Sequence, residues 1–113
     1  MSWIPNFLDR IDYVFTQTGA LAFDKLALGV GMLPSDYFHQ NVFAGFQEDA
    51  LGIRDREIIG VDNIMWSSDY PHTDSTWPHS RKVIEEEFVG VPDAEMEKIL
   101  VSNAVNLYGL NGA

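Results

Sequence analysis

A short apolar run that ends abruptly in a polar, proline-containing segment is the feature that most constrains the fold of this chain. Ile64, Met65 and Trp66 are bounded by polar residues, which is typical of a strand buried on both faces. Asp69 is the first ionisable residue after them, and Pro71 cannot extend a sheet ladder. The sequence therefore places a carboxylate at the carboxyl end of a buried strand, where α/β proteins usually keep their chemistry.

The spacing of apolar residues elsewhere predicts an alternation of strands and helices. We expect strands over residues 41–46 and 63–67, and helices over residues 6–15, 21–28, 54–59, 78–88 and 93–108. A strand, a helix, a second strand and further helices make a parallel strand pair joined by a crossover. Neither a repeat nor a linker interrupts this pattern, so the sequence predicts a single domain over residues 1–113.

Several helix boundaries follow from local residue types. Residues 34–36, Pro-Ser-Asp, are expected to form a turn. Ser75 or Thr76 is the expected N-cap of the helix over 78–88. Gly109 is expected to end the last helix, because glycine readily adopts the left-handed conformation that follows a helix.

Composition excludes several classes of partner. The net charge is −10, from 17 acidic against 7 basic residues, which argues against nucleic acid and against an anionic membrane surface. The absence of cysteine excludes disulfides and thiolate ligands. The most apolar stretch, residues 26–33, is far shorter than the roughly 20 residues that span a bilayer. With no N-terminal signal pattern, we expect a cytoplasmic location.

Three separated motifs carry a family resemblance. They are Trp-Ser-Ser-Asp-Tyr-Pro-His at 66–72, Thr-Trp-Pro at 76–78 and Asn-Ala-Val-Asn-Leu-Tyr-Gly at 103–109. In this order they resemble the C-terminal end of the amidohydrolase-related proteins, which are metal-dependent hydrolases and decarboxylases built on a (β/α)8 barrel. In that family the Asp after strand eight is a metal ligand and helps to deprotonate the attacking water. The resemblance carries this role over to Asp69.

The resemblance implies an α/β fold, the C-terminal part of a (β/α)8 barrel with about two parallel strands and flanking helices. A complete family enzyme would use a divalent metal, zinc or manganese, to hydrolyse amide or lactone bonds or to decarboxylate a small organic acid. Such a barrel needs about 250 residues, and this chain has 113 without a His-x-His pair. Because a catalytic metal usually takes three or more protein ligands, we expect the chain alone to bind no metal and to be inactive.

The candidate site residues have alternative interpretations. Asp69 could cap its own turn, as Asp often does in proline-containing loops. His72 could contact substrate or lie beside the metal ligands, or it could be a surface histidine. Glu48 and Asp49 also follow a predicted strand and could line the same mouth or be solvated.

An isolated parallel pair leaves sheet edges and faces uncovered. We therefore expect a homo-oligomer, with an interface that includes Val42, Phe46, Ile64 or Trp66, or pairing with an N-terminal polypeptide that is missing here. A complete enzyme would bind a small-molecule substrate. The alternative is a non-catalytic, oligomeric interaction module that uses the apolar strands as its interface.

Overall fold

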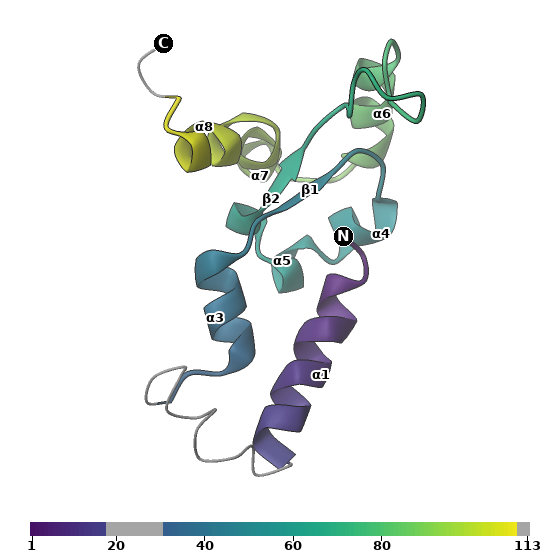
Figure 1. Cartoon of the computed structure of the whole chain (residues 1–113). Coiled ribbons are helices and arrows are strands. Elements are labelled where there is room, and N and C mark those ends of the chain that lie inside the picture. The colour runs from purple at the N-terminus through teal and green to yellow at the C-terminus, as the bar shows by residue number, and fades with distance from the viewer. Residues whose placement is uncertain (18–30, 111–113) are drawn as a thin grey trace. The chain divides into compact units, whose positions relative to one another are not determined.

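The computed structural model in Figure 1 describes residues 1–17 and 31–110. The helix predicted over 21–28 lies outside the described residues. Packing divides the chain into two compact units, one of Trp3–Val42 and the other of Met1–Ser2 with Phe43–Ala113. The single domain predicted over 1–113 stays a prediction. No helix in the described ranges has the length and apolar composition needed to cross a membrane.

The unit Trp3–Val42 contains two helices that contact each other, α1 (Ile4–Gln17) and α3 (Pro34–Asn41). The backbone N–H and the hydroxyl of Ser35 donate to the two carboxylate oxygens of Asp12, at 2.9 and 2.5 Å. α1 confirms the helix predicted over 6–15. The turn predicted at 34–36 is wrong, because Pro34 is tolerated at a first helical position and Asp36 accepts a hydrogen bond from the Leu33 N–H at 2.9 Å.

The second unit is built on a two-stranded parallel sheet, β1 (Ala44–Phe46) and β2 (Ile64–Trp66). The register pairs Ala44 with Ile64 and Phe46 with Trp66, and the Ser67 N–H donates to the Phe46 carbonyl at 2.8 Å. The parallel pair predicted from sequence is confirmed. The first strand begins three residues later than predicted, because Asn41 still belongs to α3.

The crossover between the strands contains α4 (Ala50–Arg54), α5 (Arg56–Ile59) and a 3₁₀ turn, η1 (Val61–Asn63). α5 accounts for most of the helix predicted over 54–59, and α4 was not predicted. Asp49 caps α4 by accepting a hydrogen bond from the Gly52 N–H at 2.9 Å. These elements return the chain to the end of the sheet at which β1 begins, so that β2 can run parallel to β1.

Helical structure follows β2 to the end of the described chain. The elements are α6 (Ser80–Glu87), α7 (Asp93–Glu97), a π-helical segment η2 (Lys98–Ser102) and α8 (Asn103–Tyr108). The last three run without a break and confirm the helix predicted over 93–108. Gly109 follows with φ of 65°, the left-handed end predicted for it. In Figure 1, α7 and α8 lie beside the strands, whereas α6 lies beyond their carboxyl ends.

The start of α6 differs from the prediction. The helix begins at Ser80 with His79 as its N-cap, not after Ser75 or Thr76. Neither predicted residue is the N-cap of α6, and each makes a different hydrogen bond. The Ser75 hydroxyl donates to the Ser68 carbonyl at 2.8 Å, and Thr76 is buried with its hydroxyl 2.9 Å from that of Ser80.

The C-terminal helices cover β2 through apolar and polar contacts. Ile64 and Ile99 are almost fully buried, and β2 packs on η2 and α8. The buried Asn103 amide donates to two backbone carbonyls, that of Val61 in η1 at 2.7 Å and that of Ile64, the first residue of β2, at 2.8 Å. This amide therefore ties α8 to the amino end of the strand.

Candidate functional site

The carboxyl ends of β1 and β2 lie side by side because the strands are parallel and in register. A hollow of about 340 Å³ opens at this edge. It is lined by Gly45, Phe46, Gln47, Ser67 and Asp69. The first residues after both strands thus line one hollow. This is the position that the resemblance to a barrel enzyme implies for Asp69.

Asp69 has an unusual backbone conformation at this position. Its φ is 58°, and no other non-glycine residue among those described has a positive φ. Asp tolerates the left-handed region better than most residues. Its side chain is 51% exposed, so the carboxylate can reach solutes at the mouth.

His72 is brought to Asp69 by the turn between them. The His72 N–H donates to the Asp69 carbonyl at 3.0 Å, and His72 Nδ1 lies 3.0 Å from Asp69 Oδ2. This hydrogen bond and the nearby negative charge raise the pKa of His72 above its usual value. The structure therefore brings the two site residues singled out in the sequence into direct contact.

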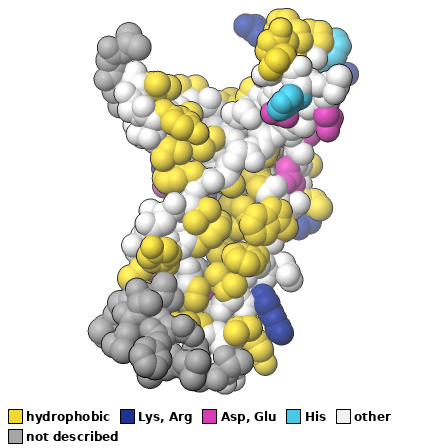
Figure 2. All heavy atoms as spheres, in the orientation of Figure 1, with side chains coloured by type: hydrophobic (Ala, Val, Ile, Leu, Met, Phe, Trp, Pro, Cys, Tyr) yellow, Lys and Arg dark blue, Asp and Glu magenta, His cyan; other side chains and the backbone are white. Residues whose placement is uncertain are grey.

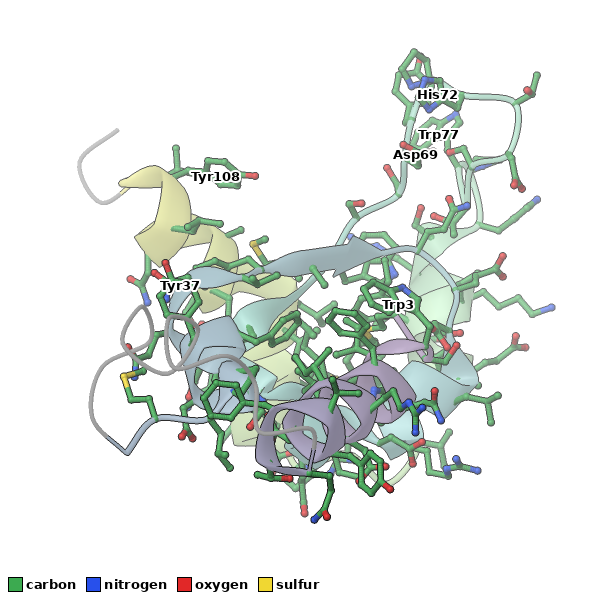
Figure 3. The ribbon with its side chains drawn as sticks, turned by 60° about the horizontal axis from the view of Figure 1, so that its bottom comes forward. Trp3, Tyr37, Asp69, His72, Trp77 and Tyr108 are labelled. Atoms are coloured by element: carbon green, nitrogen blue, oxygen red, sulfur yellow. The ribbon has the colours of Figure 1, made fainter. Side chains whose placement is uncertain are left out.

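The loop that carries this pair extends past the strand ends. Figure 3 shows Asp69, His72 and Trp77 close together on it, away from the sheet. Trp77 contacts Tyr70 edge-to-face, with 5.7 Å between ring centroids, and both side chains are more than 60% exposed. In the space-filling view, histidine and acidic side chains gather at this end of the molecule (Figure 2). The loop thus presents ionisable and aromatic groups on one exposed surface.

The two acids that follow β1 do not line the hollow. Asp49 is turned to the start of α4, and Glu48 is exposed. The residue that the sequence analysis missed is Gln47, which directly follows β1 and lines the hollow with Asp69. Its backbone carbonyl accepts a hydrogen bond from the Trp66 indole at 2.9 Å. Its Oε1 is buried and has no hydrogen-bond partner within the described part of the chain. Only its place after a predicted strand could have drawn attention to it.

The residues around the hollow supply part of a metal site. The Asp69 carboxylate is a suitable oxygen donor for a divalent cation, and the amide oxygen of Gln47 is of a type that hard cations accept. However, residues 1–17 and 31–110 hold no group of three or more His, Asp or Glu side chains that could bind a metal ion. The described residues therefore fit one carboxylate ligand and not a complete ligand set.

Comparison with known proteins identifies a family for nearly the whole chain. A family model described as "Amidohydrolase" matches residues 2–110, which include both strands and the Asp69 loop. No curated protein gives a significant match.

Proposed function

The chain belongs to the amidohydrolase family, and from this premise we propose that it provides the strand-end carboxylate of a metal-dependent catalytic site. The reaction would be hydrolysis of an amide or lactone bond, or non-oxidative decarboxylation of a small organic acid. Zinc or manganese would be the cofactor, and its chemistry is to lower the pKa of bound water towards neutrality.

The observation that carries this proposal is the position of Asp69. Its carboxylate is half exposed, follows the second of two parallel strands, and lines the hollow at their carboxyl ends. A carboxylate at this point can act as a ligand and as a proton acceptor for water that attacks a carbonyl carbon. His72, 3.0 Å from Asp69 Oδ2, would orient the carboxylate and contact the substrate.

The remaining ligands would come from elements outside the described residues. A two-stranded parallel sheet leaves strand edges that another polypeptide can pair with. We propose that either further barrel strands or a second copy of the chain covers them. Phe46 and Ile64, two of the interface residues expected from sequence, are buried. An interface would therefore use the more exposed apolar groups beside the strands, among them Phe43, Trp66 and Tyr108, which line a second hollow of about 320 Å³.

The same apolar hollow supports the second candidate function, a non-catalytic interaction module. It lies between the strands and α8, and Phe43 and Leu107 in its lining are about 40% exposed. Large exposed apolar surfaces of this kind mark sites of protein association. This candidate predicts association without any dependence on metal or on Asp69.

Metal-dependent turnover distinguishes the two candidates. The chain, together with a family polypeptide that supplies the preceding barrel strands, would be assayed with zinc and manganese on amides, lactones and small unsaturated or aromatic acids. We expect turnover that Asp69→Asn lowers about 100-fold or more, because a positioned proton acceptor contributes at least that much. Asp74→Asn removes the same charge from an exposed position of the same loop and should leave the rate unchanged. Full activity of Asp69→Asn would show that the assignment is wrong.

A further inference from the structure

The left-handed conformation of Asp69 needs support from outside the residue. With φ of 58°, Asp69 occupies a region of backbone space that persists only where surrounding contacts hold it. Both peptide groups that flank its Cα atom are held by hydrogen bonds. The Asp69 carbonyl accepts from the His72 N–H at 3.0 Å, and the Ser68 carbonyl accepts from the Thr76 N–H at 3.1 Å.

The hydroxyl of Ser75 adds a second bond to the same Ser68 carbonyl, at 2.8 Å. This carbonyl belongs to the peptide group whose rotation defines φ of Asp69, so its two donors limit that rotation. Ser75 lies six positions further along the chain and closes the loop at its base. Its hydroxyl is thus placed to control the backbone of the site residue without touching the carboxylate.

The same hydroxyl also binds the C-terminal part of the loop, at Trp77. The Trp77 N–H donates to Ser75 Oγ at 3.2 Å, and the Trp77 ring meets Tyr70 edge-to-face. One side chain therefore connects the peptide before Asp69 with the backbone of Trp77. Figure 3 shows that Asp69, His72 and Trp77 lie together on this loop.

We propose that Ser75 is a positioning residue, which sets the direction of the Asp69 carboxylate by clamping the Ser68 carbonyl and the Trp77 N–H. The inference rests on the proposed function for its catalytic consequence, but not for the geometry itself. Ser75 is a residue type favoured at helix N-caps, but its hydroxyl is used at the base of the loop and not at the start of α6.

The geometric part is tested on the full chain by nuclear magnetic resonance. The intraresidue nuclear Overhauser effect between the amide and α protons of Asp69 is strongest at a positive φ, where these two protons lie closest together, and exchange of the Thr76 amide proton reports closure of the loop. In Ser75→Ala we expect a weaker Overhauser effect and at least 10-fold faster exchange of Thr76. Ser75→Thr keeps a hydroxyl and should restore both values. Thr73→Ala, an exposed change in the same loop, should leave both as in the wild type. A wild-type Overhauser effect and wild-type exchange in Ser75→Ala would overturn the proposal.

The catalytic part uses the turnover assay described for Asp69→Asn. Ser75→Ala should lower kcat about 10- to 100-fold with little change in KM, as expected for a misplaced reacting group, and Ser75→Thr should recover most of the loss. An unchanged kcat in Ser75→Ala, in an assay where Asp69→Asn is impaired, would overturn the positioning role alone. Turnover that is insensitive to Asp69→Asn would instead contradict the proposed function, while the resonance measurements would still decide the geometry.

Discussion

The two ends of β2 are built in opposite ways. At its amino end, the buried Asn103 amide binds the carbonyls of Val61 and Ile64, and Ile64 itself is fully buried. At its carboxyl end, the chain leaves the sheet into an exposed loop whose hydrogen bonds are mostly internal, such as those between Ser68 and Ser75 or Thr76. The first end is held by distant parts of the sequence, and the second is held by its own neighbours.

This difference between the two strand ends matches the different roles of the two barrel faces in barrel enzymes. There the carboxyl ends of the strands carry the catalytic groups, and the opposite face serves stability. Asp69 and His72 are half or more exposed, so replacing them removes little packing. Asn103 is buried with two acceptors, so replacing it leaves polar groups unsatisfied. Substitutions at the amino end of β2 should therefore lower stability, whereas substitutions at its carboxyl end should affect function.

The largest effect on stability is expected for Asn103→Ala. Loss of the amide leaves the buried Ile64 carbonyl and the partly buried Val61 carbonyl without this donor, which should lower the free energy of unfolding by about 3 kcal/mol. Urea unfolding followed by circular dichroism measures it. Asn106→Ala, an exposed change on the same helix, is the control and should cost well under half as much. Equal losses in the two variants would contradict the role of Asn103.

A smaller loss is expected where the crossover meets α7. Arg56 Nε donates to Glu95 Oε2 at 2.6 Å, and both side chains are largely shielded from solvent. Removal of the carboxylate in Glu95→Ala should cost about 1 to 2 kcal/mol, between the values for exposed and buried pairs. Glu86→Ala breaks the exposed pair with Lys82 and should change stability by less than about 0.5 kcal/mol. If both substitutions had the same effect in urea unfolding, burial of the pair between Arg56 and Glu95 would not contribute to stability.

The smallest effect is a gain in stability that depends on pH. Burial, with the nearby carboxylates of Glu48 and Asp49, raises the pKa of Glu87 above its usual value of 4.5, and its Oε2 has no hydrogen-bond partner in the described chain. The folded state then holds this proton more tightly than the unfolded state, so stability falls as pH rises from the ordinary pKa to the raised one. Glu87→Gln should have a higher Tm than the wild type at neutral pH.

This advantage should shrink as the pH falls below about 4.5, where Glu87 is protonated in both the folded and the unfolded state. Melting curves between pH 4 and pH 8 provide the comparison. Glu86→Gln removes the same charge from an exposed neighbour on α6. A Tm difference for Glu87→Gln that did not change with pH would show that ionisation of Glu87 is not its source.

The sequence predicted the elements in which apolar residues recur at a regular spacing within a short stretch of chain. The apolar run at Ile64 and the break at Pro71 placed β2 and the exposed Asp69, and the alternation of Val42, Ala44 and Phe46 placed the parallel partner strand. Local chemistry was ambiguous elsewhere. Pro-Ser-Asp at 34–36 serves equally as a turn and as the first turn of a helix, and the fold uses it as the start of α3.

Other features depend on contacts that no local pattern contains. The role of Asn103 comes from carbonyls about 40 positions earlier in the chain. Gln47 reaches the Asp69 hollow only because the strand register sets the two strand ends side by side. Ser75 has the residue type of an N-cap, but its hydroxyl binds a carbonyl seven positions earlier. In each case the fold, and not a local sequence pattern, determines which residues come together.

The most direct test of the catalytic interpretation is a calorimetric titration of zinc and manganese into the chain supplemented with the family polypeptide that we propose supplies the other barrel strands. Three forms are compared: wild type, Asp69→Asn, and Asp74→Asn as the matched control. We predict stoichiometric binding to the wild type and to Asp74→Asn, and binding to Asp69→Asn that is about 100-fold weaker or worse, because loss of a direct ligand should cost at least as much as loss of an outer-shell partner. Equally tight binding to Asp69→Asn would contradict the assignment of the strand-end carboxylate to a metal site.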